Sequence, residues 1–255
     1  MNMIIINKKR IKIILSCILI SVFTFTVQAT NDTIKSKEKN ILKTTEKIET
    51  KETTATPASG KIIVLDAGHG KPDEGAQSSR GTTEAETNLK ITLKVQKLLE
   101  QNGSNVILTR SDENAIYDID SKTLRQKKIT DIRNRVKIGN ENSADIFVSI
   151  HLNKIPQSQY YGWQCFFNTK NEKSIELAKN IQENLNKSIQ KENKRVAMKL
   201  DTVYIMKKVE VPISIVECGF LSNPEEEKQL LDENYQDRLA WGIYNGIVEY
   251  FSKNP

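Results

Sequence analysis

The sequence contains few of the residues that define disulfide-rich or histidine-rich proteins. It has three cysteines and two histidines in 255 residues. Cys17 lies in an N-terminal apolar run, and the remaining pair, Cys165 and Cys218, does not make a disulfide framework. We expect both to be small buried apolar side chains, so the fold must be stabilised by an ordinary core or by a metal ion.

Long apolar runs are also scarce, and the most prominent one spans residues 13–27. Four basic residues precede it, and Val27-Gln28-Ala29 places small residues where signal peptidase cleaves. This pattern predicts a signal peptide over residues 1–29 and an exported protein, at the extracytoplasmic face of the membrane or in the cell envelope. A transmembrane helix needs about 20 apolar residues. A retained signal-anchor that tethers the protein to the membrane stays open as the alternative.

The excess of positive charge nearly disappears once that segment is set aside. The chain has 38 basic and 32 acidic residues, a net charge of +6. The segment contains four of the basic residues and no acidic one, which leaves 34 basic against 32 acidic residues. Basic blocks with interleaved aromatic residues, the usual sign of nucleic-acid binding, are absent from the sequence. We therefore expect no nucleic-acid partner.

Residues 30–60 contain mostly Thr, Lys and Glu, with few large apolar side chains. Such a segment buries too little surface to offset its ordering entropy, so a flexible linker is predicted there. From Lys61 the composition changes to alternating apolar runs and helical patterns. The sequence predicts a single folded domain over residues 61–253, with no internal repeat.

The alternation predicts an α/β domain with a mostly parallel sheet. Several predicted strands are apolar on both faces, as in a sheet that is covered on both sides. The predicted strands are residues 61–66, 105–110, 145–151, 162–168, 202–207 and 211–217, and the predicted helices are residues 84–102, 128–142, 172–192 and 235–252.

Both histidines and one carboxylate follow or end predicted strands. His69 follows KIIVLD, His151 follows DIFVSI, and Glu217 closes PISIVE. Ligands of open α/β sheets bind outside the carboxyl ends of the strands. Two histidines and a carboxylate are a known ligand set of catalytic zinc, which keeps a fourth position for water. The pattern therefore indicates a metal site, although either histidine alone would more simply be a satisfied core or turn residue.

The spacing of the residues does not decide which carboxylate completes this site. Thr83 and Glu86 have the spacing of a capping box, which gives Glu86 a structural role and leaves Glu84 free at the first helical position. Asp66, Asp73 and Glu74 are also near His69 in the sequence. Asp66 and Asn88 are candidates to orient the histidine ligands from the second coordination shell.

Four ordered segments resemble the zinc-dependent N-acetylmuramoyl-L-alanine amidases, the type-3 amidase family of bacterial cell-wall hydrolases. They are LDAGHGKPDEGA (65–76), GTTEAETNL (81–89), RVKIGNENSADIFVSIHLN (135–153) and VECGFLSNPEEEKQL (216–230). The resemblance implies a six-stranded sheet flanked by helices. It also implies Zn²⁺ on His69, Glu84 and His151, with Glu217 as the catalytic acid and base.

The implied reaction is hydrolysis of the amide between the lactyl group of N-acetylmuramic acid and L-alanine in peptidoglycan. A compact exported domain without wall-binding repeats is most similar to family members that act in sporulation and germination. This similarity implies a role in spore-cortex muramic-δ-lactam formation. The resemblance also implies that larger family members carry an inserted autoinhibitory helix between the residues that match His151 and Glu217. This interval has no room for it here, so control is expected to lie in expression, in export or in a regulatory protein partner of unknown identity.

Three other functions fit parts of the sequence. A cysteine hydrolase could use Cys218 and His151, although this would leave His69 without a role. A zinc peptidase could cleave the stem peptide, and a non-catalytic protein could bind the cell wall with the same fold. Tyr160, Tyr161 and Trp163 could stack on sugar, but packing at a strand edge is an equal explanation. Arg135 is expected to be solvated or ion-paired.

Overall fold

The structure is a computed structural model that describes residues 55–255, which form one compact unit. The predicted segment 1–29 and most of the predicted linker lie outside these residues. Residues 56–60 were expected to belong to the linker, but they form a turn packed on the domain. Ala58 is fully buried, and its carbonyl accepts a hydrogen bond from Ser104 Oγ at 2.8 Å. The linker prediction is wrong there, while the remaining domain boundaries stay predictions.

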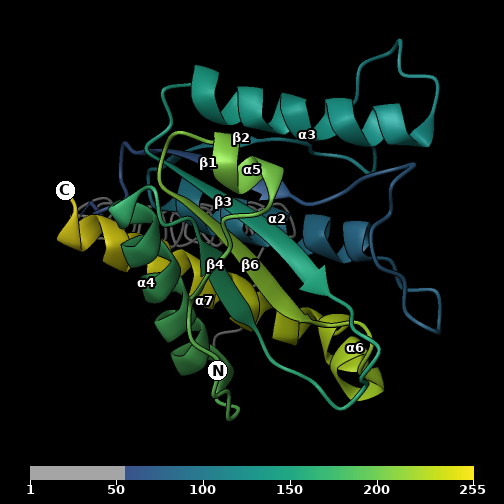
Figure 1. Cartoon of the computed structure of the whole chain (residues 1–255). Helices are drawn as coiled ribbons and strands as arrows, with labels where there is room; N and C mark the ends of the chain where they lie inside the picture. Colours follow the sequence, from purple (N-terminus) through teal and green to yellow (C-terminus); the bar gives the residue numbers. More distant parts are fainter. Residues whose placement is uncertain (1–54) are drawn as a thin grey trace, which may run out of the picture. The chain divides into compact units, whose positions relative to one another are not determined.

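The described residues form a six-stranded sheet with helices on both faces (Figure 1). The strand order is β2-β1-β3-β6-β4-β5, and every neighbouring pair is parallel except β4 with β6. The strands are β1 (Ile62–Ala67), β2 (Asn105–Leu108), β3 (Ile146–Asn153), β4 (Gln164–Phe167), β5 (Met198–Lys199) and β6 (Ile213–Phe220). The helices are α2 (Glu84–Gln101), α3 (Leu124–Glu141), α4 (Glu172–Ile189), α5 (Tyr204–Lys208), α6 (Pro224–Leu230) and α7 (Glu233–Lys253). The α/β class and the mostly parallel six-stranded sheet are confirmed.

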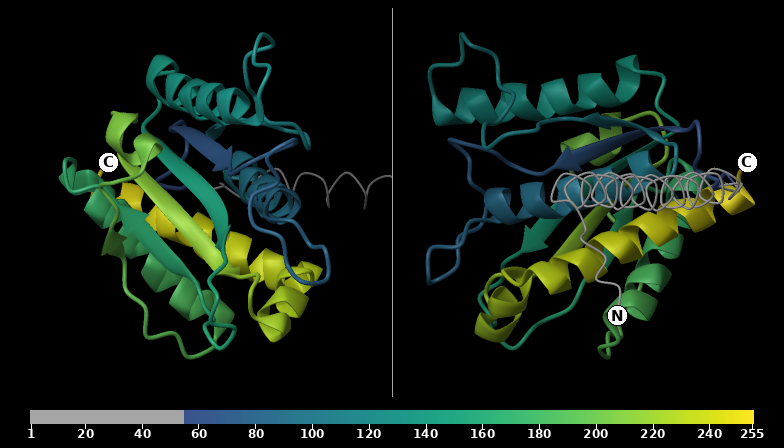
Figure 2. Two further views of the ribbon diagram at one scale, coloured as in Figure 1. Left: turned by 45° about the vertical axis from the view of Figure 1, so that its right-hand side comes forward. Right: turned by 180° about the vertical axis from the view of Figure 1, so that it is seen from behind.

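Two apolar layers hold the helices on the sheet, because alternate side chains of each strand point to opposite faces. The larger layer lies under α2, α4 and α7, and contains Val216 and Cys218 of β6. The smaller layer lies under α3 and α5, and contains Ile213 and Ile215 of the same strand. Figure 2 shows these helices on the two sides of the sheet. Glu217 continues the alternation of Ile213 and Ile215, so it lies on the α3–α5 face. None of the described helices has the length and apolar character needed to cross a membrane.

One predicted strand is wrong. Residues 202–207 overlap α5, which ends at Lys208, and the strand in this part of the chain is the two-residue β5, which pairs with β4. A short apolar run has no periodicity that separates a strand from a buried helix turn. Ile205 and Met206 are buried together and Val209 lies one turn later in the same apolar layer, which is the spacing of a helix. The other five predicted strands and all four predicted helices are present.

The parallel strands β1, β3 and β6 end at the same edge of the sheet. In the register, Ala67 of β1 lies beside Ile150 of β3, and His151 lies beside Glu217 of β6. This alignment brings the chain segments that follow β1 and β3 to the start of α2, where the candidate site is formed.

Candidate metal centre

His69, Glu84 and His151 lie close enough to hold one metal ion. Each offers one ligand atom, and the three atoms lie within 4.8 Å of one another. The two imidazole rings have centroids 5.1 Å apart and cross at 77°. The three residues come from the loop after β1, the first residue of α2, and the end of β3. The structure therefore brings together the three residues that the resemblance implies as ligands.

Glu84 lies between the two histidines. Its Oε1 is 2.9 Å from His151 Nδ1, and its Oε2 is 3.3 Å from His69 Nε2. The same oxygens accept hydrogen bonds from the backbone N–H groups of Leu152 at 3.1 Å and Ala76 at 2.8 Å. The carboxylate is 5% exposed, so these four contacts fix its orientation.

The predicted capping box at the start of α2 is wrong. Thr83 is the N-cap residue, but its side chain accepts no capping hydrogen bond. The first helical N–H groups instead donate to the carbonyls of Ala76 and Glu74. Because this loop supplies the acceptors, Glu86 is not needed for capping, and it forms an ion pair with Lys90 at 2.6 Å.

Two glycines allow these side chains to meet. A Cβ on Gly68 would lie 2.3 Å from His151 Nε2, and a Cβ on Gly75 would lie 2.5 Å from Glu84 Oε2. Neither distance is possible for a real side chain, so both positions require glycine. His69 itself has φ 63°, a left-handed conformation that is uncommon outside glycine. Sequence reasoning found the flexible backbone at Gly68 but missed Gly75, whose signal is a glycine directly after two acidic residues.

Asp73 is the orienting residue that sequence reasoning considered only as a ligand. Its Oδ2 lies 3.4 Å from His69 Nδ1, the ring nitrogen that faces away from Glu84. Asn88 donates to Gly68 O at 3.1 Å and to Glu84 Oε1 at 3.5 Å, so it contacts Glu84 and neither of the histidines that it was predicted to orient. Asp66 makes no hydrogen bond to either imidazole and instead binds Arg135 at 2.6 Å in the interior. The ion pairing expected for Arg135 is confirmed.

The carboxylates of Glu84 and of the neighbouring Asp73 dominate the electrostatics around His69. Burial lowers the pKa of His69, but Asp73 and Glu84 outweigh it and raise this pKa to about 9. Burial raises the pKa of Glu84, but the two histidines outweigh it and hold the pKa below its usual value. A site that stabilises a protonated imidazole so strongly also favours a bound divalent cation in its place. The donor set and its charge therefore fit a metal ion.

Glu217 lies beside the cluster on the neighbouring strand. Its register partner on β3 is His151, and both line a cavity of about 390 Å³ that also contains His69. Burial raises the pKa of Glu217 to about 7. Its Oε2 is buried and has no hydrogen-bond partner among the described residues. A buried carboxyl oxygen without a partner is costly, and at the wall of a cavity it is a candidate acid or base.

Comparisons with known proteins agree with this geometry. A sequence profile of the N-acetylmuramoyl-L-alanine amidases matches residues 63–249. The chain belongs to this amidase family. The germination-specific N-acetylmuramoyl-L-alanine amidase of Bacillus subtilis (strain 168) is 37% identical over 197 residues, which cover 77% of this chain and 82% of the relative.

Two solved amidases share the fold. The CwlD amidase from Clostridioides difficile, determined in complex with the GerS lipoprotein, has a TM-score of 0.74 at 45% identity and covers 76% of this chain and 100% of that chain. An N-acetylmuramoyl-L-alanine amidase from Clostridium difficile 630 has a TM-score of 0.68 at 28% identity, and the match covers 77% of this chain and 100% of that chain. The chain is thus an enzyme, an amidase of peptidoglycan, and a relative of the germination-specific members.

The two cysteines within residues 55–255 are not placed for catalysis. Cys165 and Cys218 are both free and fully buried. Burial raises the pKa of the Cys218 thiol, so the nucleophilic thiolate is disfavoured. Cys218 also belongs to the apolar layer on the face opposite Glu217 and the cavity. These observations exclude the cysteine-hydrolase alternative and confirm the cysteines as buried apolar side chains.

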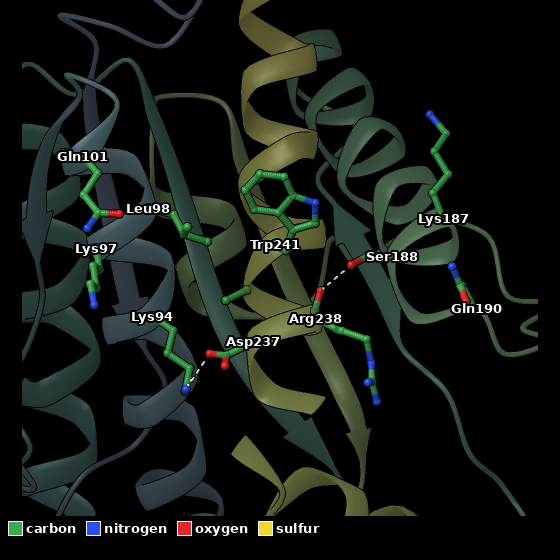
Figure 3. Close-up of a pocket in the computed structure, with 11 residues that line it drawn as sticks. Lys94, Lys97, Leu98, Gln101, Lys187, Ser188, Gln190, Asp237, Arg238 and Trp241 are labelled. Atoms are coloured by element: carbon green, nitrogen blue, oxygen red, sulfur yellow. Dashed lines mark hydrogen bonds and ion pairs between the residues drawn. The ribbon is translucent and has the colours of Figure 1, made fainter. Parts of the chain in front are cut away.

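A wider groove of the amidase lies away from the cluster (Figure 3). It has a volume of about 730 Å³ between α2, α7 and the end of α4. Its lining includes Lys94, Arg238 and the half-exposed Trp241, and no lining residue is a histidine or a cysteine. Lys94 is paired with Asp237 at 2.6 Å. Asp237 is the one carboxylate among the residues that line the groove, so the groove does not offer a set of metal ligands like that of His69, Glu84 and His151.

Proposed function

We propose that the amidase uses a zinc ion held by His69, Glu84 and His151, with Glu217 as its acid and base. The bond cleaved is the amide between the lactyl group of N-acetylmuramic acid and L-alanine. The observation that carries this proposal is the buried carboxylate of Glu217, which has an unpartnered oxygen at the wall of the cavity beside the three-residue cluster. Two imidazoles and a carboxylate leave zinc a fourth position for water or substrate.

When bound, such an ion would supply a more acidic water molecule and polarise the scissile carbonyl. The protein's residues perform the proton transfers. Glu217 accepts a proton from the attacking water as the oxygen adds to the carbonyl carbon. It then donates that proton to the alanine nitrogen as the C–N bond breaks, so its carboxylate returns to its starting state. The pKa of about 7 suits a group that must both accept and donate a proton near neutral pH.

Asp73 and the backbone position the ligands for this reaction. The hydrogen-bond distance from Asp73 to His69 Nδ1 favours the tautomer with a free Nε2, which is the nitrogen that faces Glu84. The N–H groups of Ala76 and Leu152 hold the Glu84 carboxylate in place. The protein thus restricts the side-chain motion that would otherwise be lost on metal binding.

A peptidoglycan digest with purified residues 55–255 tests the reaction. We expect new peptides with free N-terminal alanine by mass spectrometry with zinc present, and none with a chelator. Cleavage inside the stem peptide would instead indicate a zinc peptidase. Tight binding to the wall without any new amine would indicate a non-catalytic wall-binding protein.

We further propose a role in spore-cortex muramic-δ-lactam formation, since the amidase is similar to a germination-specific relative. Removal of the peptide frees the lactyl carboxyl group that a lactam needs. Spores from cells with an inactive Glu217→Gln amidase should contain peptidoglycan without muramic-δ-lactam. Normal lactam content in those spores would contradict this role.

We also propose that the protein is exported and acts with a protein partner. The predicted N-terminal signal or anchor and the peptidoglycan substrate support an extracytoplasmic location. The similar CwlD amidase was determined in complex with the GerS lipoprotein. Size-exclusion chromatography of the amidase with a candidate lipoprotein from the same cells should show one co-eluting complex, and separate elution would contradict this pairing.

A further inference from the structure

The candidate catalytic row of the sheet continues beyond Glu217. In the register of β3, β6 and β4, His151 lies beside Glu217, and Glu217 lies beside Gln164. Register partners in neighbouring strands point to the same face of a sheet, so these three side chains form one row on that face, and His151 and Glu217 line the cavity. Gln164 is 8% exposed, and its Oε1 accepts a hydrogen bond from Arg195 Nη1 at 3.2 Å. The row therefore ends at a guanidinium group.

Arg195 is held in place on several sides. Its Nε donates to Tyr161 O at 3.3 Å, and its guanidinium carbon lies 4.8 Å from the ring centroid of Phe220 and 5.9 Å from that of Tyr160. Both rings are within the range of a cation–π contact. Its Nη2 donates to no described residue. Arg195 is thus a positioned cation with one free pair of N–H donors.

The lysine and the arginine that line this cavity are already engaged, and Arg135 is paired with Asp66 at 2.6 Å. Lys128 lines the cavity and is paired with Asp73 at 2.9 Å. On the other side of Glu217, Arg195 carries the free donors. A planar guanidinium with two free N–H groups matches a carboxylate, and this match makes arginine the usual residue for carboxylate recognition.

The proposed mechanism places the leaving peptide on this side of the site. Glu217 donates its proton to the alanine nitrogen, so that nitrogen lies at Glu217, and the acyl group lies toward the metal cluster. Neighbouring strands are about 4.8 Å apart, and Arg195 hydrogen-bonds Gln164 on the strand next to Glu217, so its guanidinium lies on the order of 10 Å from Glu217. An extended peptide advances roughly 3.5 Å per residue, so a carboxylate on its second residue lies about 7 Å from the scissile nitrogen. Hydrogen bonds of about 3 Å at Glu217 and at Arg195 extend this reach to about 13 Å, so the carboxylate can reach the guanidinium from a nitrogen held at Glu217.

We propose that Arg195 binds a free carboxylate on the second residue of the leaving peptide. The inference rests on the proposed amidase reaction and assigns its peptide specificity to the row that ends at Arg195. The amidase then prefers stem peptides that keep this carboxylate over stem peptides in which it is amidated. Gln164 positions Arg195 by accepting its Nη1 hydrogen bond.

The test uses two matched glycan strands whose peptides differ in one group only, a carboxylate or the carboxamide on the second residue. The zinc-loaded protein is assayed on both, and the ratio of the two kcat/KM values is the readout. We expect wild type to prefer the carboxylate by about tenfold, which is typical of one charge-assisted hydrogen bond at a partly exposed site. Arg195→Gln should bring the ratio near one, mainly through a higher KM for the carboxylate substrate.

Lys194→Gln is the matched control. It removes one positive charge from the neighbouring position, where the side chain is 87% exposed and paired with Glu192. We expect this variant to keep the wild-type ratio. If Arg195→Gln does not fold, Arg195→Lys and the wild-type ratio at rising salt replace it. A preference that weakens with salt supports the charge contact, because salt screens exposed charges.

Two results would overturn the inference while the amidase reaction stands. One is equal cleavage of both substrates by wild type. The other is an Arg195→Gln variant that loses activity on both substrates equally. Arg195 would then only stabilise the structure, through its hydrogen bonds to Tyr161 and to Gln164 of β4. If wild type releases no N-terminal alanine from either substrate, the proposed reaction itself fails.

Discussion

Replacing Arg135 by methionine should destabilise the amidase strongly. Arg135 is 3% exposed and lies beside Asp66, which is 1% exposed, with Nη1 2.6 Å from Oδ1. Its Nε donates to Asp131 at 2.8 Å. It also donates to the carbonyls of Ala67 at 2.7 Å and of His69. The variant removes the cation that compensates Asp66 and releases the turn that presents His69.

The magnitude follows from the burial of this pair. Breaking a buried ion pair by removing one partner costs about 3–5 kcal/mol, because the other charge stays buried without compensation. Asp66 keeps hydrogen bonds from Thr109 at 2.7 Å and Ser149 at 2.6 Å, which limit the loss to the lower part of that range. For a domain of this size, 3 kcal/mol corresponds to a decrease in Tm of roughly 6–12 °C.

The loss should depend on pH. In the wild type, burial raises the pKa of Asp66, but Arg135 and the two hydroxyl groups outweigh it and hold the pKa below 3.8. A depressed pKa stabilises the folded state at pH values above 3.8, and this contribution is lost as the pH falls through the folded-state pKa. Without Arg135, burial would raise the pKa of Asp66. As the pH falls, protonation of Asp66 then removes the uncompensated charge and reduces the destabilisation of the variant. The difference between the two proteins should therefore be larger at pH 7 than near pH 4.

Urea unfolding at both pH values measures this difference in the free energy of unfolding. Arg133→Met is the matched control on the same helix, where the side chain is exposed, and it should change stability by less than about 0.5 kcal/mol. The double variant Asp66→Asn/Arg135→Met should lose less than the sum of the two single variants. A loss below 1 kcal/mol for Arg135→Met at pH 7, or the same loss at both pH values, would refute the reasoning.

Three further predictions concern the site itself. Glu217→Gln should keep zinc, measured by metal analysis, but lose about 10²–10⁴-fold in kcat, and full activity would remove Glu217 from the mechanism. Glu84→Ala should lose most of its zinc, whereas Glu86→Ala should keep it and lose at most about 0.5 kcal/mol of stability, because Glu86 makes only an exposed ion pair. Equal zinc in the two glutamate variants would reverse the ligand assignment. Gly68→Ala should reduce both zinc content and Tm, because its Cβ would lie 2.3 Å from His151 Nε2, and an unchanged protein on both measures would contradict the close approach.

Local sequence patterns were sufficient to predict most of the strands and helices. The runs before His69 and His151 are apolar and end at a polar residue or a glycine, and such runs predict buried strands whatever their neighbours are. The segment at residues 202–207 failed because six residues without alternation fit a strand or a helix turn equally well. Its burial beside α3 decided for the helix, and sequence spacing does not contain that contact.

The sequence alone predicted that both histidines and Glu217 lie toward the carboxyl ends of parallel strands, and such ends meet at one edge of the sheet. The prediction that Glu217 closes its strand is wrong, because β6 continues to Phe220. Spacing left open which carboxylate joins them, and only the tertiary structure placed Glu84 between the two rings and Asp73 behind one of them. The same holds for the Arg135 network and for the row from His151 to Arg195. These arrangements depend on register and on helix placement between segments that are far apart in the chain, which local sequence patterns do not encode.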